Sequence, residues 1–362
     1  MKRTIAILLS MMMCAGLLAG CGVAPAPSDA AASAAASAAQ RASEPAEPAA
    51  PAASATGAVP TGDKPIALLI PSPVGDPFIA LCVKGLEKLS EETGAELKII
   101  ETLDKAEYED QVRAMAELGA KPVYCMWGDL SELAVKVAPE YPDTQFILAD
   151  VYLKTTQPNV RSISVHPYAS SFTPGYIAAN STEVGKVGFI AHADRPVSRR
   201  YRDGFIAGVH YVDESIPVEV AYVGNDQDPV KGQEVAKLMI QNNGVDLIFQ
   251  SASRSGLGVI AGCADQGIKC IGSDDWQGDV DPCVFWSALK PFDEALYVEG
   301  KSVFDGTYES GDKAYGLEQG LPMYDQRDFD KLPEELQQGV LAVVEGIKSG
   351  EIQITEDENV VQ

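Results

Sequence analysis

The sequence has 362 residues, with 52 Asp and Glu against 28 Lys and Arg, which gives a formal net charge of −24 at pH 7. An acidic surface repels nucleic acid and anionic lipid headgroups, and no Lys/Arg cluster in the sequence is long enough to form a phosphate-binding stripe. We therefore expect no nucleic-acid partner.

The N-terminal segment has the parts of a lipoprotein signal peptide. Two basic residues precede an apolar stretch, 4–18, that is too short to span a bilayer comfortably. The residues LAGC at 18–21 resemble the bacterial lipobox, in which a peptidase cuts before the cysteine and leaves it as a lipidated N-terminus. We expect residues 1–20 to be a signal peptide and Cys21 to carry the lipid. The alternative is an ordinary secretory signal with an incidental cysteine.

A low-complexity segment follows the predicted lipid site. Residues 22–63 are rich in Ala, Ser and Pro and contain almost no large apolar side chain. Such a segment cannot bury enough surface to offset the entropy of ordering, so we expect 21–63 to be the lipidated cysteine and a disordered linker. A lipid and a long stalk predict attachment to the extracytoplasmic face of the cell membrane, in a Gram-positive-type envelope.

Apolar runs alternate with helical patterns over the remaining 299 residues, which are enough for two domains. Short apolar runs predict a first series of strands at 65–71, 95–101, 122–127 and 145–150, and a second at 186–192, 218–224, 246–251, 269–274 and 283–290. Helical patterns are expected at 78–94, 108–120, 130–142, 168–180, 199–212, 230–242, 258–266, in the segment up to 303, and at 332–350. Strands buried on both faces and separated by helices indicate two doubly wound, parallel α/β lobes of Rossmann-like type.

The loops after the strands are the places to look for a site, because open α/β sheets bind ligands outside the carboxyl ends of their strands. These loops are 75–78, 127–129, 150, 193–196, 225–227, 253–256 and 274–277. The ligand-binding candidates from them are Asp76, Phe78, Trp127, Asp129, Asp150, Asn225, Arg254, Asp274 and Trp276. Asp194 and Asp226, taken alone, are expected to cap helices instead. The three aromatic candidates could either stack on a ligand or pack in the core.

The sequence has no GxSxG, HExxH or GxxxxGK(S/T) motif and no GxGxxG after a strand, and the three histidines, at 166, 192 and 210, have no ligand-like spacing. Asp274 and Asp275 could act as an acid–base pair, but such a pair beside a tryptophan is equally suited to hydrogen-bonding sugar hydroxyls. We therefore expect a binding protein with no catalytic residue, no metal and no cofactor. The cysteines after Cys21 lack a metal-type pair and are expected to be buried thiols, with a bridge between Cys263 and Cys270 as the less favoured alternative.

Several segments, in this order, resemble the basic membrane protein (BMP) family, the PnrA-like nucleoside-binding lipoproteins of ABC transporters. They include GDPF at 75–78, GKVGFIAHADRPV at 185–197, GVDLIFQSASRSGLGVI at 244–260 and IGSDDWQ at 271–277, and the likeness covers 64–362. The resemblance implies a type I periplasmic-binding-protein fold, an α/β fold in which two lobes are joined by a hinge and a ligand is clamped in the cleft between them.

The resemblance also implies a site. Family members hold purine nucleosides or bases by stacking the ring between aromatics and by bonding the ribose with acidic and lysine side chains. Carried over by position, these roles fall on Phe78, Asp274 and Lys290. The second aromatic of the family is missing at 225–227, so Trp127 or Trp276 would have to supply it. Arg254 stands where relatives commonly have a small residue, which leaves an anionic or otherwise altered ligand as an alternative.

The sequence therefore predicts a lipid-anchored substrate-binding protein that captures a purine nucleoside or a related small polar aromatic ligand by domain closure. Its expected partners are that ligand, an ABC permease and its ATPase, and the membrane through the lipid. The alternatives are a ligand sensor that feeds a signalling pathway, a binder of a sugar or other non-nucleoside ligand, and a surface hydrolase. The N-terminal lobe is expected to comprise 64–183 plus about 288–318, and the C-terminal lobe 184–287 plus about 319–362.

Overall fold

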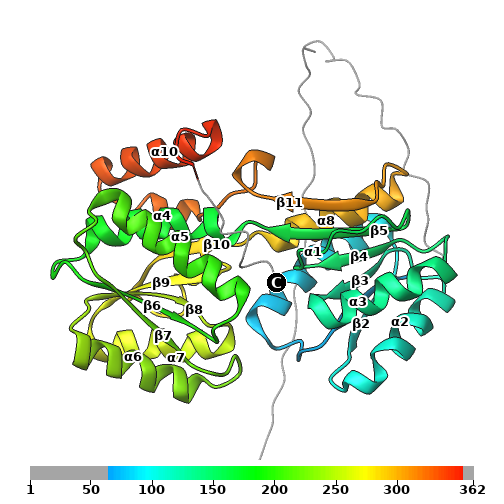
Figure 1. Cartoon of the computed structure of the whole chain (residues 1–362), viewed down its shortest axis with the longest axis horizontal. Helices are drawn as coiled ribbons and strands as arrows, with labels where there is room; N and C mark the ends of the chain where they lie inside the picture. Colours follow the sequence, from blue (N-terminus) through cyan, green and yellow to red (C-terminus); the bar gives the residue numbers. More distant parts are fainter. Residues whose placement is uncertain (1–63, 354–362) are drawn as a thin grey trace, which may run out of the picture. The chain divides into compact units, whose positions relative to one another are not determined.

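The computed structural model describes residues 64–353, which contain two parallel sheets (Figure 1). The first sheet has the strand order β11-β5-β4-β3-β1-β2. Its strands are β1 (Ile66–Ile70), β2 (Leu97–Glu101), β3 (Val123–Met126), β4 (Phe146–Ala149), β5 (Val160–Val165) and β11 (Gly311–Tyr315). The second sheet has the order β10-β9-β8-β6-β7. Its strands are β6 (Val187–Ala191), β7 (Val218–Tyr222), β8 (Leu247–Ser251), β9 (Lys269–Asp274) and β10 (Val284–Leu289).

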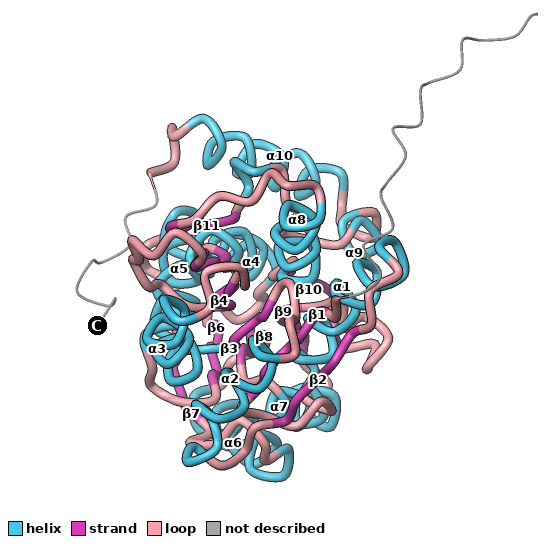
Figure 2. The backbone as a smooth tube through the Cα atoms, turned by 90° about the vertical axis from the view of Figure 1, so that its right-hand side faces the viewer, coloured by secondary structure: helices cyan, strands magenta, loops and turns pink. Residues whose placement is uncertain are grey.

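Helices cover both faces of each sheet, and Figure 2 shows helices around the strands. The helices are α1 (Pro77–Thr93), α2 (Tyr108–Glu117), α3 (Trp127–Val137), α4 (Pro167–Ser181), α5 (Pro196–Val212), α6 (Pro229–Asn243), α7 (Arg254–Gln266), α8 (Phe292–Phe304), α9 (Gln326–Phe329) and α10 (Glu334–Ser349). In β1, Ile66, Leu68 and Ile70 join the core beneath α1 and α8, whereas Ala67 and Leu69 join the core beneath α2 and α3. Alternate side chains of a strand point to opposite faces, so a strand covered on both sides is apolar throughout.

This architecture confirms the predicted α/β fold of two parallel-sheet lobes. Two strands were not predicted. β5 reads VRSISV and carries a buried arginine, Arg161, whose Nε lies 3.4 Å from Oε2 of the buried Glu299 on α8. β11 reads GDKAY and lies at the edge of the sheet beside β5. Neither strand has an apolar run. In β5 the buried charge of Arg161 is paired with Glu299, and β11 lies at the sheet edge, where polar side chains remain partly exposed.

The chain returns to the first sheet after α8, since β11 pairs with β5. Helix α4 packs mainly on α5, and α10 packs on α4. The exact division of the two lobes at 183/184 and at about 288 and 318 stays a prediction.

Helices α4 and α5 cross very closely, and this contact fixes the direction of α5. A Cβ atom added to Gly208 would lie 2.0 Å from the carbonyl oxygen of Phe172, and one added to Gly175 would lie 2.1 Å from that of Phe205. Only glycine permits this approach of two backbones. The N-terminus of α5 is thereby held where the binding cavity begins.

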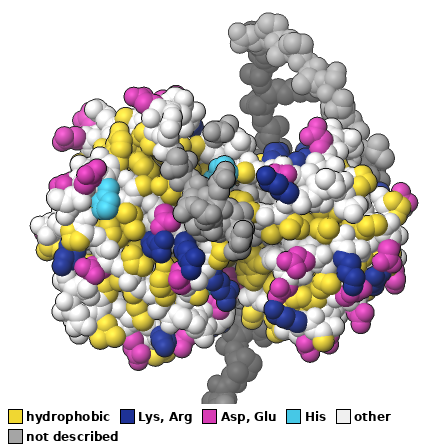
Figure 3. Space-filling model, viewed as in Figure 1, with side chains coloured by type: hydrophobic (Ala, Val, Ile, Leu, Met, Phe, Trp, Pro, Cys, Tyr) yellow, Lys and Arg dark blue, Asp and Glu magenta, His cyan; other side chains and the backbone are white. Residues whose placement is uncertain are grey.

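The five described cysteines are free, and four of them are buried, so the Cys263–Cys270 bridge considered from the sequence is absent. Over 64–353, no helix has both the length and the apolar composition needed to cross a membrane. Cys21 and the predicted signal peptide and linker lie outside the described residues. On the face in Figure 3 acidic side chains stand beside basic ones.

Candidate functional site

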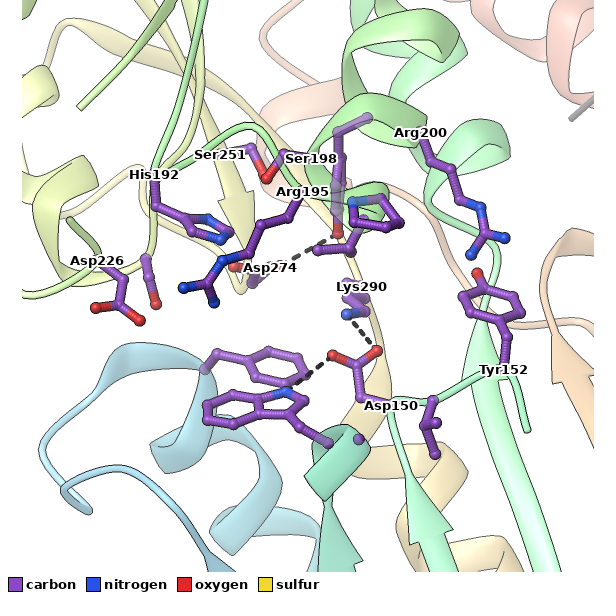
Figure 4. A pocket seen from close by; sticks show the side chains of 18 residues that line it. Asp150, Tyr152, His192, Arg195, Ser198, Arg200, Asp226, Ser251, Asp274 and Lys290 are labelled. Atoms are coloured by element: carbon purple, nitrogen blue, oxygen red, sulfur yellow. Dashed lines mark hydrogen bonds and ion pairs between the residues drawn. The ribbon is translucent and has the colours of Figure 1, made fainter. Parts of the chain in front are cut away.

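A cavity of about 480 Å³ lies at the carboxyl ends of strands from both sheets (Figure 4). Its walls come from the loops after β3, β4, β6, β7, β8, β9 and β10 and from the first turns of α1 and α5. The lining residues are Phe78, Trp127, Gly128, Asp150, Val151, Tyr152, His192, Arg195, Pro196, Val197, Ser198, Arg200, Tyr201, Asp226, Ser251, Ser253, Asp274 and Lys290. This volume falls in the range of pockets that hold small ligands.

Backbone strain is concentrated at this cavity. Within 64–353, four non-glycine residues have a positive φ: Trp127 at 61°, Asp150 at 58°, Ser253 at 52° and Asp274 at 72°. All four line the cavity. A non-glycine residue pays free energy in this region of φ/ψ space, and such residues cluster at functional sites because the strain aims side chains at a ligand.

Asp150 and Lys290 form the polar centre of the cavity. Lys290 is buried, and its Nζ lies 2.7 Å from Oδ1 of Asp150. The indole Nε1 of Trp127 donates to Oδ2 of the same carboxylate at 3.2 Å. The ammonium of Lys290 also lies 4.4 Å from the centroid of the Phe78 ring. These contacts hold both aromatic side chains and both charges in place before any ligand binds.

Asp274 is the second carboxylate of the cavity. The hydroxyl of Tyr201 donates to its Oδ1 at 3.3 Å. Burial raises the pKa of Asp274 to about 6; Lys290 opposes this shift, and the charges of Asp150 and Asp76 add to it. The group is therefore mostly ionised at neutral pH and can accept hydrogen bonds from ligand hydroxyls.

Asp76 lies outside the cavity lining and has other partners. It is 2% exposed, and its Oδ1 accepts from the backbone N–H groups of Phe78 and Ile79 at the start of α1. Its Oδ2 accepts from Ser253 Oγ at 2.9 Å and from Gln227 Nε2 at 3.0 Å. Asp76 follows β1 of the first sheet, whereas Gln227 and Ser253 follow β7 and β8 of the second. The carboxylate therefore joins the loops of the two sheets.

Of the ten residues expected from the sequence, Phe78, Trp127, Asp150, Asp274 and Lys290 line the cavity, and the others do not. Asp129 is exposed and pairs with Lys105. Asn225 accepts from the backbone N–H of Gln227 at 2.7 Å, and Arg254 is exposed at the start of α7.

Trp276 also lies away from the cavity. Its Nε1 donates to Oδ1 of Asp328 at 3.0 Å, and the guanidinium of Arg327 lies 3.5 Å from the ring centroid. Of the two candidate tryptophans, only Trp127 thus faces the cavity.

The expected capping roles of Asp194 and Asp226 were wrong. Helix α6 is capped by Asp228, whose Oδ1 accepts from the N–H of Lys231 at 3.0 Å, and Asp226 lines the cavity instead. Helix α5 has no side-chain cap, because Asp194 pairs with Arg199 at 2.7 Å. An Asp at a strand end can fill either role, and only the path of the loop decides between them.

The cavity also contains residues that were not on the list of candidates: Tyr152, His192, Arg195, Ser198, Arg200, Tyr201, Ser251 and Ser253. Arg200 stacks over the ring of Tyr152 at 3.7 Å from its centroid. Burial, followed by the charge of Arg195, lowers the pKa of His192, so its imidazole is neutral at pH 7. The strand-end rule pointed to the loop of His192 and Arg195 but did not select these side chains. No group of three or more potential metal ligands occurs within the described part of the chain.

Comparisons with known proteins give the site a context. The model of the family described as "ABC transporter substrate-binding protein PnrA-like" matches residues 64–358. Basic membrane protein A2 of Borrelia garinii is 26% identical over 273 residues, which cover 73% of this chain and 80% of that protein. The purine-binding protein BAB2_0673 of Brucella abortus is 27% identical over 248 residues, or 68% and 69% of the two chains.

A solved structure shares the fold. The ABC transporter solute-binding protein from Aeropyrum pernix aligns with a TM-score of 0.68 at 23% identity, covering 82% of this chain and 95% of that one. At this identity the likeness concerns the fold alone.

Proposed function

Because the chain belongs to the Bmp family of PnrA-like ABC transporter substrate-binding proteins, we propose that it captures a purine nucleoside or a related planar polar ligand. The family consists of binding proteins rather than enzymes, so the hydrolase considered from the sequence is wrong. The bound ligand would be delivered to an ABC permease and its ATPase. A sensor role without transport stays an alternative prediction.

One observation carries the choice of ligand: the strained residues of the cavity bring an indole and two carboxylates to its wall. A flat ring can stack on the aromatic face of Trp127 or Phe78. Ribose hydroxyls can donate to Asp274 and to Asp150, and Lys290 can donate to a ligand oxygen. The name of the Brucella relative, a purine-binding protein, supports the same ligand class.

Titration calorimetry with adenosine, guanosine, inosine and their free bases tests the proposal. We expect micromolar or tighter binding of at least one nucleoside, and mass spectrometry of the purified protein should detect the same compound if it co-purifies. Binding of a monosaccharide such as ribose, with no heat from any nucleoside or base, would refute the proposal and favour the sugar alternative.

The cleft is further proposed to close around the ligand. A ligand shifts a two-lobed protein toward the closed state by its higher affinity for that state. Hydrogen bonds from Gln227 and Ser253 to Asp76 connect loops of the two sheets. Neither Asp76 nor Gln227 lines the cavity. These hydrogen bonds would form only on closure and so favour the closed state independently of the ligand.

Replacement of Gln227 by alanine should raise the ligand dissociation rate about tenfold and leave the association rate unchanged, because a bond to a buried carboxylate is lost only in the closed state. Stopped-flow fluorescence measures both rates. Gln233→Ala is the matched control, since Gln233 bonds to Asp265 between α6 and α7, away from the cavity. Equal rates in both variants and the wild type would exclude this role of Asp76 and Gln227.

The membrane anchor is proposed from the sequence, since Cys21 lies outside the described residues. A Cys21→Ser variant should accumulate unprocessed or leave the membrane fraction, because the acyl chains would be absent. Fractionation followed by mass determination checks this. A Cys21→Ser protein of mature size in the membrane fraction would contradict the lipid anchor on the extracytoplasmic face.

A further inference from the structure

The N-terminus of helix α5 faces the cavity. Pro196, Val197 and Ser198 form its first turn and line the cavity, and the helix continues for 17 residues to Val212. Pro196 has no N–H, but the N–H groups of Val197 and Ser198, as at the start of any helix, have no partner within the helix and carry a partial positive charge. An N-cap side chain can accept from them, as Asp76 does in α1 and Asp228 in α6, but Arg195 at this N-cap provides no acceptor.

The hydroxyl of Ser198 lacks a partner at the same place. The residue is 1% exposed, and its Oγ forms no hydrogen bond within 64–353. A buried hydroxyl without a partner costs free energy, and most such groups in proteins are satisfied. Because Ser198 lines the cavity, a ligand atom can supply the missing acceptor.

Arg195 adds a full positive charge. Its side chain extends from the start of α5 into the cavity (Figure 4), and its guanidinium forms no hydrogen bond or ion pair with another described residue. The next arginines of α5 differ: Arg199 pairs with Asp194, and Arg202 pairs with Asp203, each at 2.7 Å. In a chain of net charge −24, an arginine that faces a cavity without an acidic partner needs an explanation.

At this end of the cavity the charge of Arg195 is not neutralised by an ion pair. Arg195 and Asp226 both line the cavity, but no ion pair joins them (Figure 4). On the opposite wall the charge of Asp150 is balanced by Lys290 at 2.7 Å. A negative group of a ligand would therefore be stabilised beside α5 and repelled near Asp274.

We propose that the N-terminus of α5, Ser198 and Arg195 form a binding site for an anionic group of the ligand. Phosphate and carboxylate share the required chemistry: both accept from helix N–H groups, a hydroxyl and a guanidinium. The ligand class is then a planar ring that carries such a group, as in a nucleoside 5′-monophosphate. The inference rests on the proposed function for the ring, and it adds a second point of recognition.

Calorimetry with three probes tests this site: adenosine, adenosine 5′-monophosphate and orotate, a pyrimidine ring with a carboxylate. We expect one of the two anions to bind at least tenfold more tightly than adenosine, and the identity of that anion distinguishes phosphate from carboxylate. This preference should decrease as salt is raised from 50 to 500 mM, since an exposed charge contributes to it.

Arg195→Gln should reduce the affinity for the preferred anion about ten- to a hundredfold and leave adenosine binding unchanged. Arg199→Gln is the matched control, because it removes the same charge from the same helix outside the cavity lining. Ser198→Ala should weaken only the anion, by several-fold. Circular dichroism of each variant verifies that it is folded, which we expect because the side chain of Arg195 makes no hydrogen bond or ion pair with another residue of 64–353.

The outcomes separate this inference from the proposed function. Tight binding of adenosine, with neither anion preferred, would overturn the anion site and retain the proposed function. Equal effects of Arg195→Gln and Arg199→Gln would also overturn it, since the affinity would then depend on overall charge. If none of the three probes binds, the anion site is refuted, whereas the proposed function is refuted only if guanosine, inosine and the free bases also fail to bind.

Discussion

Replacing Asp274 by asparagine is expected to weaken ligand binding about ten- to a hundredfold at pH 7.5 and, at the same pH, to increase the stability of the protein. The loss of binding follows from the loss of a charged acceptor in the cavity, since a desolvated hydrogen bond to a charged group contributes about 1.5–3 kcal/mol. The gain in stability follows from the pKa of Asp274, which is raised from its ordinary value of 3.8 to about 6.

The size of the stability change depends on pH. A carboxyl whose pKa is raised in the folded state binds its proton more tightly there than in the unfolded chain. Its carboxylate therefore destabilises the fold above pH 6, and this effect disappears below about pH 4, where both states are protonated. The difference in pKa corresponds to about 2 kcal/mol once partial exposure is allowed for. Asp274→Asn should thus be more stable than the wild type at pH 8 and equal to it at pH 4.

Urea unfolding at pH 4, 6 and 8 measures the stability, and calorimetry measures the binding. Asp275→Asn is the control, because Asp275 is the exposed neighbour, lies outside the cavity lining and undergoes the same change of charge. A stability difference that is independent of pH would show that Asp274 titrates normally. Unchanged binding by Asp274→Asn would remove this residue from the ligand site.

Trp127→Ala is expected to reduce affinity about ten- to a hundredfold, whereas Trp276→Ala should leave it unchanged. Stacking of a base on an aromatic side chain contributes about 1–3 kcal/mol. Trp127 lines the cavity and donates to Asp150, while the Trp276 indole donates to Asp328 away from the cavity. Ligand-induced quenching of tryptophan fluorescence should also disappear in Trp127→Ala and persist in Trp276→Ala.

Phe78→Ala is a less selective test of stacking. The ring is 6% exposed and packs at 5.5 Å from the ring of Phe292, so its removal also leaves a void in the core. We expect weaker binding together with a loss of stability. Equal affinity in Phe78→Ala, Trp127→Ala and Trp276→Ala would mean that all three rings serve packing, and the proposal of a stacked ring would then be wrong.

The sequence by itself determined the fold class and five of the eighteen residues that line the cavity. Runs such as IALLI in β1 are apolar at every position because both faces of the strand are covered, and this pattern is visible without a structure. Open parallel sheets bind ligands at the carboxyl ends of their strands, and this rule predicts Trp127, Asp150 and Asp274 as site residues. The missed strands β5 and β11 lack such a pattern, since Arg161 in β5 is buried only because Glu299 of α8 reaches it.

Only the tertiary structure decided which side chain of each loop faces the cavity. Trp127 and Trp276 both follow strand ends, and Asp328, 52 residues further along the chain, keeps Trp276 outside. The sequence favours Asp76 as a ligand residue, but its carboxylate accepts a hydrogen bond from Gln227, 151 residues further along the chain. Arg195 faces the cavity because glycines let α5 approach α4 closely. Hydrogen bonds and close packing between distant residues select the direction of a side chain, and no local pattern in the sequence records them.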